Sequence, residues 1–291
     1  MKAKKTSGEK IFETAVYIIL GIMLILVLFP LMYVVAGSLT SAKELAANRF
    51  VIFPKEPTLD VYKYILKTKT FPRSMFISVC ITVAGTFVNL VMTCLTAYPL
   101  SKRNLPGRSF FMLGVTITLV FSGGMIPTYL VVNGIGLVDT YGALIIPVAI
   151  NSFNLILVKN FFQEIPESLI EAAKIDGSSE INTLAKIVLP LSKPALATFT
   201  MFYAVTHWNR FLEPLLYLND SKKWTVQVLL RQIVMLSSSG GDDEASMPGF
   251  VLPVLSLKLA VVVVSSLPLI AAYPFMQKYF DKGVMAGSVK G

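Results

Sequence analysis

The stretch EAAKIDGSSEINTLAKIVLPLSKP, residues 171–194, is both amphipathic and charged, and it lies between two strongly apolar runs. Pro166 and Glu167 predict the start of a helix just before it, because proline suits the first helical turn and an acid complements the positive helix end. Gly177 is expected to end this helix, since glycine adopts a positive φ at no steric cost. The first part of the stretch is therefore predicted to be a short helix that stops at a glycine elbow.

A second short helix is predicted after the elbow. Either Ser178 or Ser179 can cap its first turn. Pro190 and Pro194 are expected to break it, because proline lacks the backbone N–H that a helix interior needs. A helix, an elbow and a second helix have a shape suited to docking in a groove of another protein. The alternative is an ordinary amphipathic connector between two apolar helices.

The composition of the whole chain points to a lipid bilayer as its solvent. Of its 291 residues, 54% are hydrophobic and only 15% are charged, which is too apolar for a soluble domain. The net charge of +9 could suggest a nucleic-acid partner, but the basic residues are scattered in connectors, as on membrane flanks. Cys80 and Cys94 lie about 21 Å apart along one predicted helix, too far for a disulfide.

Six apolar runs predict six transmembrane helices, since about 20 apolar residues cross a bilayer. A cleaved signal peptide is the rival interpretation of the first run, but that run is longer than a signal-peptide core. The predicted fold is therefore an all-α membrane protein with both ends on one side. The runs cover Ala15 to Gly37, Met75 to Leu100, Phe110 to Val132, Tyr141 to Val158, Ala195 to Leu218 and roughly Leu257 to Met276.

The third run is interrupted by Ser122-Gly123-Gly124 and by Pro127. Broken backbone at membrane depth is tolerated where protein or a wet cavity satisfies it, so the break can mark the lining of a transport pathway. Alternatively, the helix simply ends near Phe121 and re-forms. Both interpretations stay open at the level of the sequence.

The first stretch also carries a recognisable motif. Glu171-Ala172-Ala173, Asp176-Gly177, Ile187, Leu189-Pro190 and Pro194 match the EAA signature of bacterial ABC-importer permeases. In that family this loop is the cytoplasmic element that docks on the ATP-hydrolysing subunit. The resemblance therefore implies an ABC importer permease of type I architecture, with residues 159–194 as its cytoplasmic coupling loop.

Three further motifs extend the resemblance almost end to end. Residues 121–129, 207–215 and 282–291 resemble motifs of carbohydrate permeases, most closely those for complex-polysaccharide fragments such as rhamnogalacturonan-type oligosaccharides. Many relatives read Trp-Asn-Asp in the second of these motifs, where this chain has Arg210. This difference puts a neutral-sugar assignment in doubt, so the expected substrate is a complex oligosaccharide that is either acidic and uronic-acid-containing or neutral.

The resemblance also implies the domains, the partners and the location. We expect a cytoplasmic tail (1–14), a first helix with its extracytoplasmic connector (15–73), a core permease domain (74–280) and a cytoplasmic tail (281–291). The expected partners are a second permease in a heterodimer, two ATPase subunits, an extracytoplasmic solute-binding protein, membrane lipid and the oligosaccharide. ATP and Mg²⁺ would bind to the ATPase subunits, and this chain would bind no cofactor and no nucleic acid.

Both termini are expected in the cytoplasm of a bacterium, because the coupling loop must face ATP. The first outer connector, residues 38–73, nevertheless carries more Lys and Arg than any inner connector, which the positive-inside rule disfavours. A short surface helix is expected around Tyr62 and Leu66 in this connector. A long polar connector with a mobile turn is expected at residues 219–252.

The resemblance assigns roles within the coupling loop. Glu171 would orient the loop, Gly177 would make the bend, and Leu184 and Ile187 would fill the groove of the ATPase. The alternative for each apolar side chain is packing within this chain. The complete set of expected coupling residues is Glu171, Ala172, Ala173, Asp176, Gly177, Leu184, Ile187 and Pro190.

A second set of residues is expected along the substrate pathway. Arg210 either recognises an anionic sugar, since arginine grips carboxylates bidentately, or pairs with Glu213 three residues on along the same helix face. The sequence leaves both roles open. The complete set is Phe121, Tyr129, Tyr203, His207, Trp208, Asn209, Arg210 and Glu213.

Several kinds of chemistry are missing from the sequence. There is no phosphate-binding Gly-x-x-x-x-Gly-Lys-Ser/Thr loop and no nucleophile elbow, so we expect a transport subunit and no enzyme. One histidine and two cysteines do not make a metal cluster. A neutral-oligosaccharide permease is the alternative function. A secondary transporter, which should show inverted repeats or intramembrane acids, and a membrane sensor or assembly factor are more distant ones.

Overall fold

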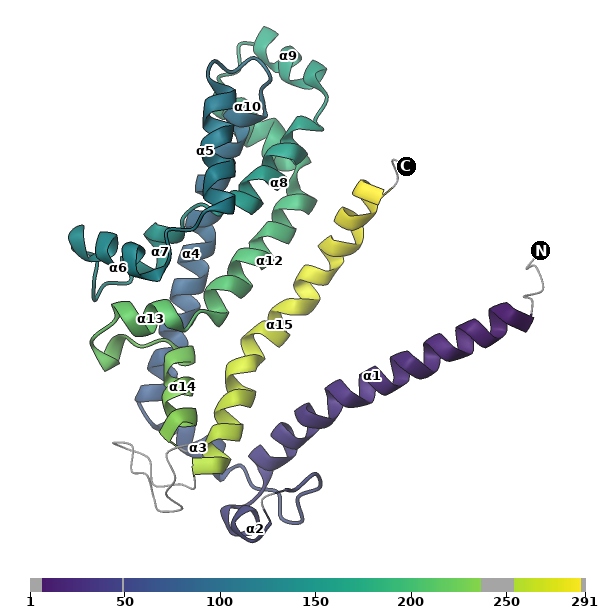
Figure 1. The fold of residues 1–291 in the computed structure, drawn as a ribbon, viewed down its shortest axis with the longest axis vertical. Coiled ribbons are helices and arrows are strands. Elements are labelled where there is room, and N and C mark those ends of the chain that lie inside the picture. The colour runs from purple at the N-terminus through teal and green to yellow at the C-terminus, as the bar shows by residue number, and fades with distance from the viewer. Residues whose placement is uncertain (1–6, 49, 237–253, 289–291) are drawn as a thin grey trace. The chain divides into compact units, whose positions relative to one another are not determined.

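The computed structural model describes residues 7–48, 50–236 and 254–288, and within these ranges the chain is helical without a β-strand (Figure 1). Its contacts divide it into two compact units. The first comprises Met1–Lys69 and Gln232–Ser266, and the second comprises Thr70–Arg231 and Leu267–Gly291. The predicted all-α class is confirmed.

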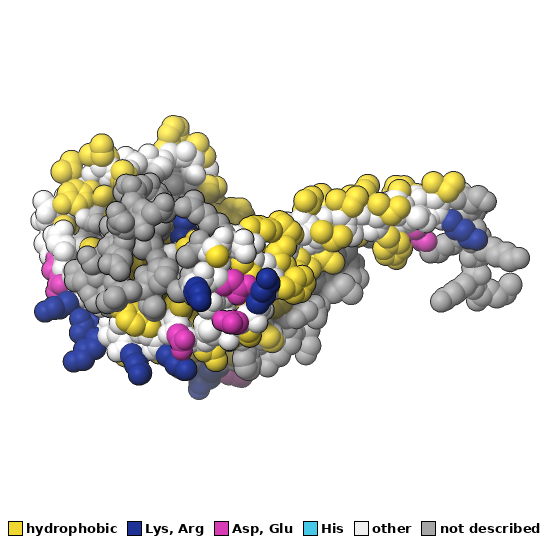
Figure 2. All heavy atoms as spheres, turned by 90° about the horizontal axis from the view of Figure 1, so that it is seen from below, with side chains coloured by type: hydrophobic (Ala, Val, Ile, Leu, Met, Phe, Trp, Pro, Cys, Tyr) yellow, Lys and Arg dark blue, Asp and Glu magenta, His cyan; other side chains and the backbone are white. Residues whose placement is uncertain are grey.

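The first unit begins with the long helix α1 (Ser7–Leu39), followed by α2 (Ala42–Ala47) and α3 (Asp60–Lys67). Hydrophobic side chains cover the surface of α1 (Figure 2), and many are more than half exposed, as expected for a helix whose solvent is lipid. The short helix α3 is the one predicted in the first connector. It buries Ile65, and the Tyr62 hydroxyl forms a 2.6 Å hydrogen bond with the Ser38 hydroxyl.

Three helices are long and apolar enough to cross a membrane, namely Gly8–Leu39, Thr70–Ser101 and Leu255–Pro274. Three bent helix pairs also qualify, with bends of 118°, 54° and 86° at their breaks. If each pair is counted as one span, the described residues contain up to six spans, the number that the apolar runs predict. The pairs are Arg108–Val120 with Met125–Gly134, Gly142–Val148 with Ser152–Gln163, and Glu180–Leu191 with Lys193–Asn209. The third pair begins at Glu180, within the coupling loop, and not at the predicted Ala195.

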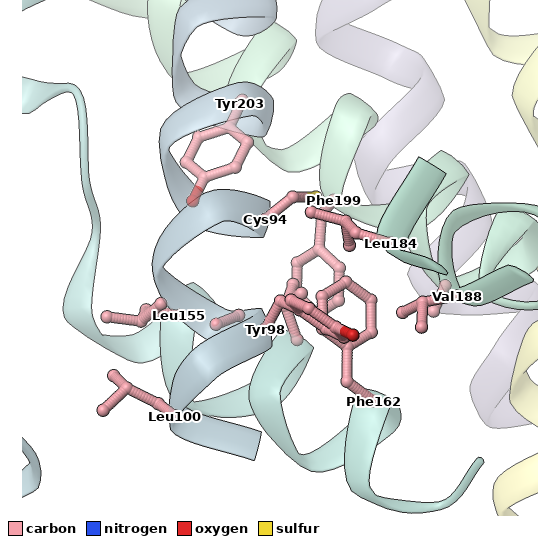
Figure 3. Packing of buried hydrophobic residues seen from close by; sticks show 12 residues of the cluster. Cys94, Tyr98, Leu100, Leu155, Phe162, Leu184, Val188, Phe199 and Tyr203 are labelled. Carbon is pink, nitrogen blue, oxygen red and sulfur yellow. The ribbon is translucent and has the colours of Figure 1, made fainter. Parts of the chain in front are cut away.

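The second unit is built around α4 (Thr70–Ser101), which packs against α8 (Ser152–Gln163) and α12 (Lys193–Asn209) (Figure 1). Buried side chains from these three helices and from the coupling loop form one apolar cluster (Figure 3). The cluster fixes both the loop and the spans on α4. Its members are Cys94, Ala97, Tyr98, Leu100, Leu155, Val158, Phe162, Leu184, Val188, Ala195, Phe199 and Tyr203.

The predicted break in the third run is confirmed. Helix α5 (Arg108–Val120) ends immediately before Phe121, and α6 (Met125–Gly134) begins after Gly124, whose φ is +82°. This is the geometry of a helix that ends near Phe121 and re-forms. A tight turn with Gly136 at φ +73° follows α6.

The fourth run does not form the single helix that the sequence analysis expected. It forms α7 (Gly142–Ile145), a 3₁₀ turn (Ile146–Val148) and then α8. Pro147 removes one backbone donor, and the Asn151 side chain caps α8 by accepting the Asn154 N–H at 3.0 Å. These two residues explain why the run bends.

The helix formed by the fifth run is also shorter than predicted. Helix α12 ends at Asn209, and α13 (Leu212–Tyr217) and a 3₁₀ turn (Ser221–Lys223) follow. The predicted polar connector at 219–252 is wrong over α14 (Val226–Leu236), which buries Val226, Leu229 and Ile233. That spacing of three and four residues is a helical pattern that the sequence already contains. The predicted mobile turn at 240–244 lies outside the described residues.

The last helix, α15 (Val254–Ser288), runs beyond the predicted end of the sixth span near Met276. It continues through most of residues 281–291, where a tail was expected. Between α8 and α12, the coupling loop forms α9 (Glu167–Ile175), α10 (Glu180–Thr183), a π-helical turn (Leu184–Val188) and α11 (Leu189–Leu191).

Candidate coupling site and substrate pathway

The glycine elbow of the coupling loop forms as predicted. Gly177 has a φ of +78° and donates its N–H to the Lys174 carbonyl at 3.0 Å. The Ser178 N–H reaches back to the Ala173 carbonyl at 2.9 Å. These two bonds close the end of α9 in the arrangement typical of a left-handed helix terminus. A Cβ on Gly177 would meet no atom within 4 Å, so only the backbone conformation demands glycine here.

The structure shows which of the two serines caps the second short helix. Ser179 caps α10, because its hydroxyl accepts the Asn182 N–H at 3.3 Å. The predicted break at Pro190 is wrong, since α10, the π-helical turn and α11 run on through it. The π-helical turn ends at Val188, immediately before the short helix that contains Pro190. Such a turn accommodates an interruption of the regular α-helical hydrogen bonds.

The chain instead bends by 86° between Leu191 and Lys193. Pro194 lies in the first turn of α12, where a missing N–H costs nothing. This proline therefore starts a helix, where the sequence analysis expected it to end one.

The expected coupling residues divide by exposure. Leu184 is 6% exposed and lies in the apolar cluster (Figure 3), and Ala173 is 7% exposed. Ile187 is half-buried, whereas Ile175 and Ile181 are 87% and 75% exposed. Leu184 thus packs within this chain, as the alternative interpretation has it, and the exposed apolar side chains flank the elbow. The remaining expected residues are exposed: Glu171, Ala172, Asp176, Gly177 and Pro190.

A polar cluster that the sequence analysis did not foresee lies beside the loop. The Tyr98 hydroxyl donates to Glu180 Oε2 at 2.8 Å, and Lys102 Nζ forms an ion pair with the same oxygen. Lys174 Nζ lies 3.7 Å from Glu180 Oε1. The single carboxylate of Glu180 therefore joins α9 and α10 to the end of α4.

A cavity of about 500 Å³ adjoins this cluster. Its walls are mostly apolar and come from α4, from the turn after it and from the coupling loop. The apolar lining includes Leu95, Pro99, Leu105, Pro106, Ile181 and Leu184.

A second polar network is buried between α4, the last turns of α12 and the 3₁₀ turn that precedes α8. His207 Nε2 on α12 lies 2.6 Å from Asn89 Oδ1 on α4, and Asn89 Nδ2 donates to the Val148 carbonyl at 2.5 Å. One turn away, the Tyr203 and Thr93 hydroxyls are 2.8 Å apart. Buried polar groups are costly unless paired, so these bonds fix the register of three helical segments.

The same network needs a glycine. A Cβ on Gly85 would lie 2.5 Å from the His207 ring, so α4 can approach α12 this closely only without a side chain at that position. His207, Tyr203 and Trp208 are all less than 8% exposed. Three of the expected pathway residues are thus buried inside this chain.

Arg210 and Glu213 form the ion pair that was one of its two predicted roles. Arg210 Nε lies 3.3 Å from Glu213 Oε1, and the side chains are 15% and 37% exposed. They do not share a helix face, however, because α12 ends at Asn209 and Arg210 has an extended backbone. The pair therefore bridges the break between α12 and α13. Arg210 Nη1 also lies 3.5 Å from the Leu144 carbonyl.

The remaining pathway residues lie apart from one another. Phe121 and Asn209 are exposed. Tyr129 is half-buried and stacks on Tyr217 of α13, with ring centroids 6.0 Å apart. The structure therefore gathers only the α12 motif and its neighbour Glu213, and leaves the third-run residues on a separate segment.

Asp139 and Lys223 join the connector before α7 to the turn after α13. Lys223 Nζ donates to Asp139 Oδ2 at 2.6 Å, and Asp139 Oδ1 accepts the N–H groups of Asn219 and Asp220. The hydrogen bond from Lys223, followed by the one from the Asp220 N–H, lowers the pKa of Asp139. The same bond raises the pKa of Lys223. Asp139 has a φ of +59°, a conformation that an aspartate tolerates.

Comparisons with known proteins agree with the motifs. The family described as "Binding-protein-dependent transport system inner membrane component" matches residues 3–286. Protein LplC of Bacillus subtilis (strain 168) is 51% identical over 98% of this chain and 97% of that protein. The polygalacturonan/rhamnogalacturonan transport system permease protein YtcP of the same organism is 48% identical, over 97% and 99%.

A solved structure is also similar over nearly the whole chain. It is a chain from the crystal structure of a bacterial ABC transporter involved in the import of the acidic polysaccharide alginate, with a TM-score of 0.88 at 31% identity. The match covers 96% of this chain and 100% of that one. YtcP and the alginate transporter chain are described as transport proteins, and none of the three descriptions is that of an enzyme. The chain therefore belongs to the family of binding-protein-dependent transport system inner membrane components, as a membrane-embedded permease of an ABC sugar importer.

Proposed function

We propose that this permease translocates an acidic, uronic-acid-containing oligosaccharide in an ATP-driven importer. The observation that carries the proposal is the nature of its relatives. One is a permease for polygalacturonan and rhamnogalacturonan at 48% identity, and another belongs to an importer of the acidic polysaccharide alginate. Both are matched over more than nine tenths of this chain.

The end of α12 offers suitable chemistry for such a substrate. Asn209 is exposed, and the neighbouring Arg210 holds a guanidinium at the break after the helix. A guanidinium binds a carboxylate through two parallel hydrogen bonds. In the proposal, Arg210 exchanges the carboxylate of Glu213 for that of the sugar as the substrate passes.

The assembly around the chain is part of the same proposal. A second permease completes the pathway, two ATPase subunits bind ATP and Mg²⁺, and an extracytoplasmic binding protein delivers the oligosaccharide. Both termini and the loop at 159–194 face the cytoplasm. The exposed elbow at Gly177, with Ile175 and Ile181 beside it, docks on an ATPase subunit.

One observation favours a neutral oligosaccharide instead. Arg210 is already paired with Glu213, and a neutralised guanidinium has less to offer a carboxylate. In this second account the pair only fastens α13 to the end of α12. The two accounts make different predictions for charged and uncharged substrates.

A panel of ligands distinguishes them. The purified complex would be offered binding protein loaded with neutral or uronic-acid oligosaccharides of equal length, and ATP hydrolysis would be measured. The proposal predicts stimulation by the uronic-acid series alone. Equal stimulation by both series, or by the neutral series alone, would contradict it.

A further inference from the structure

Glu180 connects the coupling loop to the second membrane span. Its carboxylate accepts the Tyr98 hydroxyl at 2.8 Å and pairs with Lys102, both at the end of α4. It also lies 3.7 Å from Lys174, on the other side of the glycine elbow. The two halves of the loop and the end of the span thus meet at a single acidic side chain.

The end of α4 is firmly held at this point. Tyr98 is 5% exposed within the apolar cluster (Figure 3), and Lys102 Nζ lies over its ring, 4.6 Å from the centroid. Tyr98 therefore presents its hydroxyl from a fixed position. Any shift of Glu180 is transmitted to a residue packed in the core, because close-packed interiors transmit displacement.

The packing around Glu180 is different. The cavity of about 500 Å³ lies between the end of α4 and the coupling loop, with Leu105 and Ile181 among its walls. Leu184 and Val188 hold the loop on α4 through the apolar cluster, but the cavity interrupts apolar contact beside Glu180, where its polar contacts complete the connection. The cavity leaves room for Glu180 and its neighbour Ile181 to move.

We propose that Glu180 transmits a displacement of the coupling loop to the second membrane span. The inference rests on the proposed function, in which this loop docks on an ATPase subunit. Glu180 is a positioning residue, since it acts through Tyr98, Lys102 and Lys174. Its side chain is 55% exposed, and exposed ion pairs contribute little to folding stability. Its removal should therefore disturb coupling and leave folding intact.

The test uses the complete purified importer with Glu180→Gln, which keeps the size and the acceptor for Tyr98 but loses the charge. Three quantities are measured: the ratio of substrate-stimulated to basal ATP hydrolysis, the ATPase subunits retained per permease, and the melting temperature. We expect the ratio to fall by about fivefold, the lower end of couplings between two sites. Retention and melting temperature should not change. Glu164→Gln, an exposed acid of the same loop, is the matched control and should keep the wild-type ratio.

A charge exchange adds a second variant. Glu180→Lys combined with Lys102→Glu restores opposite charges at positions 180 and 102. The double variant should recover most of the stimulated-to-basal ATP hydrolysis ratio that Glu180→Lys alone loses. The inference is overturned by an unchanged ratio in Glu180→Gln, by loss of the ATPase subunits, or by a parallel fall in melting temperature. A wild-type complex that shows no stimulation would contradict the proposed function itself, and the inference with it.

Discussion

The two polar networks attached to α12 differ in their surroundings. Glu180, on the helices leading into α12, binds its partners at a surface where its side chain is 55% exposed. His207, in the last turn of α12, pairs with Asn89 where both residues are less than 8% exposed. Solvent-exposed ion pairs exchange at little cost, whereas a buried donor or acceptor left unpaired costs about 1–3 kcal/mol. The polar contacts of Glu180 can thus exchange at little cost, whereas those of His207 fix the register of α12 against α4.

The largest expected effect of a single change lies at the elbow of the coupling end. Gly177→Val should reduce substrate-stimulated ATP hydrolysis to the basal rate while the amount of protein in the membrane stays near normal. A β-branched residue resists the positive φ of +78°, although a Cβ there has space. Gly177→Asn, which tolerates this conformation, is the matched control and should retain most of the stimulation. Full stimulation in Gly177→Val would mean that the elbow is only a connector.

Arg210→Gln should have the next largest effect. We expect uptake of uronic-acid oligosaccharides to fall by about tenfold, the size of one lost charge-assisted hydrogen bond, while uptake of neutral ones changes little. Transport assays with both substrate series check this. Equal loss for both series, repaired by also changing Glu213→Gln, would assign the pair a structural role only.

The rigid network is tested by Gly85→Ala. The added Cβ would lie 2.5 Å from the His207 ring, so either the ring leaves Asn89 or α4 and α12 separate, at a cost of roughly 1–3 kcal/mol. The melting temperature of the detergent-solubilised protein should fall. Gly114→Ala in α5, where a Cβ meets nothing within 4 Å, is the control and should not lower it. Similar melting temperatures for both variants would show that α4 and α12 are less tightly packed around His207 than its hydrogen bonds indicate.

The smallest effect is expected at the Asp139–Lys223 pair, which is solvent-accessible like the Glu180 cluster. The pKa of Asp139 is below its usual 3.8, so its contribution to stability is present above that pH and is lost as the pH falls through the lowered value. The pKa of Lys223 is above its usual 10.5, so its contribution is lost as the pH rises through the raised value. The small melting-temperature difference between wild type and Asp139→Asn should therefore be constant between about pH 5 and pH 9 and should shrink in stronger acid or base. A difference that changes within that window would point to another titrating group.

The neighbouring residues in the sequence predicted the coupling loop better than they predicted the network around His207. The conformation of Gly177 and the serine cap after it follow from neighbouring residues, and both are present in the structure. The bend at Pro147 could also have been predicted from the sequence, because a proline and a capping asparagine stand four residues apart. The continuous apolar run led us to expect a single helix instead.

The contacts between distant residues could not be predicted in this way. Tyr98 and Glu180 are 82 positions apart, and Asn89 and His207 are 118 apart. The sequence shows that Asn89 and His207 are polar residues in apolar runs and that Glu180 lies in a charged stretch. Only the packing of α4 against α12 and the coupling loop shows which residues meet. Asn89, an amide in the middle of the second apolar run, was the one signal available.

The most direct test of the account is the side of the membrane on which the coupling loop lies. In a background without Cys80 and Cys94, single cysteines would replace Ile175, which is 87% exposed beside the elbow, and Asn48, in the first connector. A membrane-impermeant thiol reagent is added to intact cells and then to permeabilised ones. The account predicts labelling of position 48 in intact cells and of position 175 only after permeabilisation. Labelling of position 175 in intact cells would contradict it, because a loop outside the cell cannot reach an ATPase.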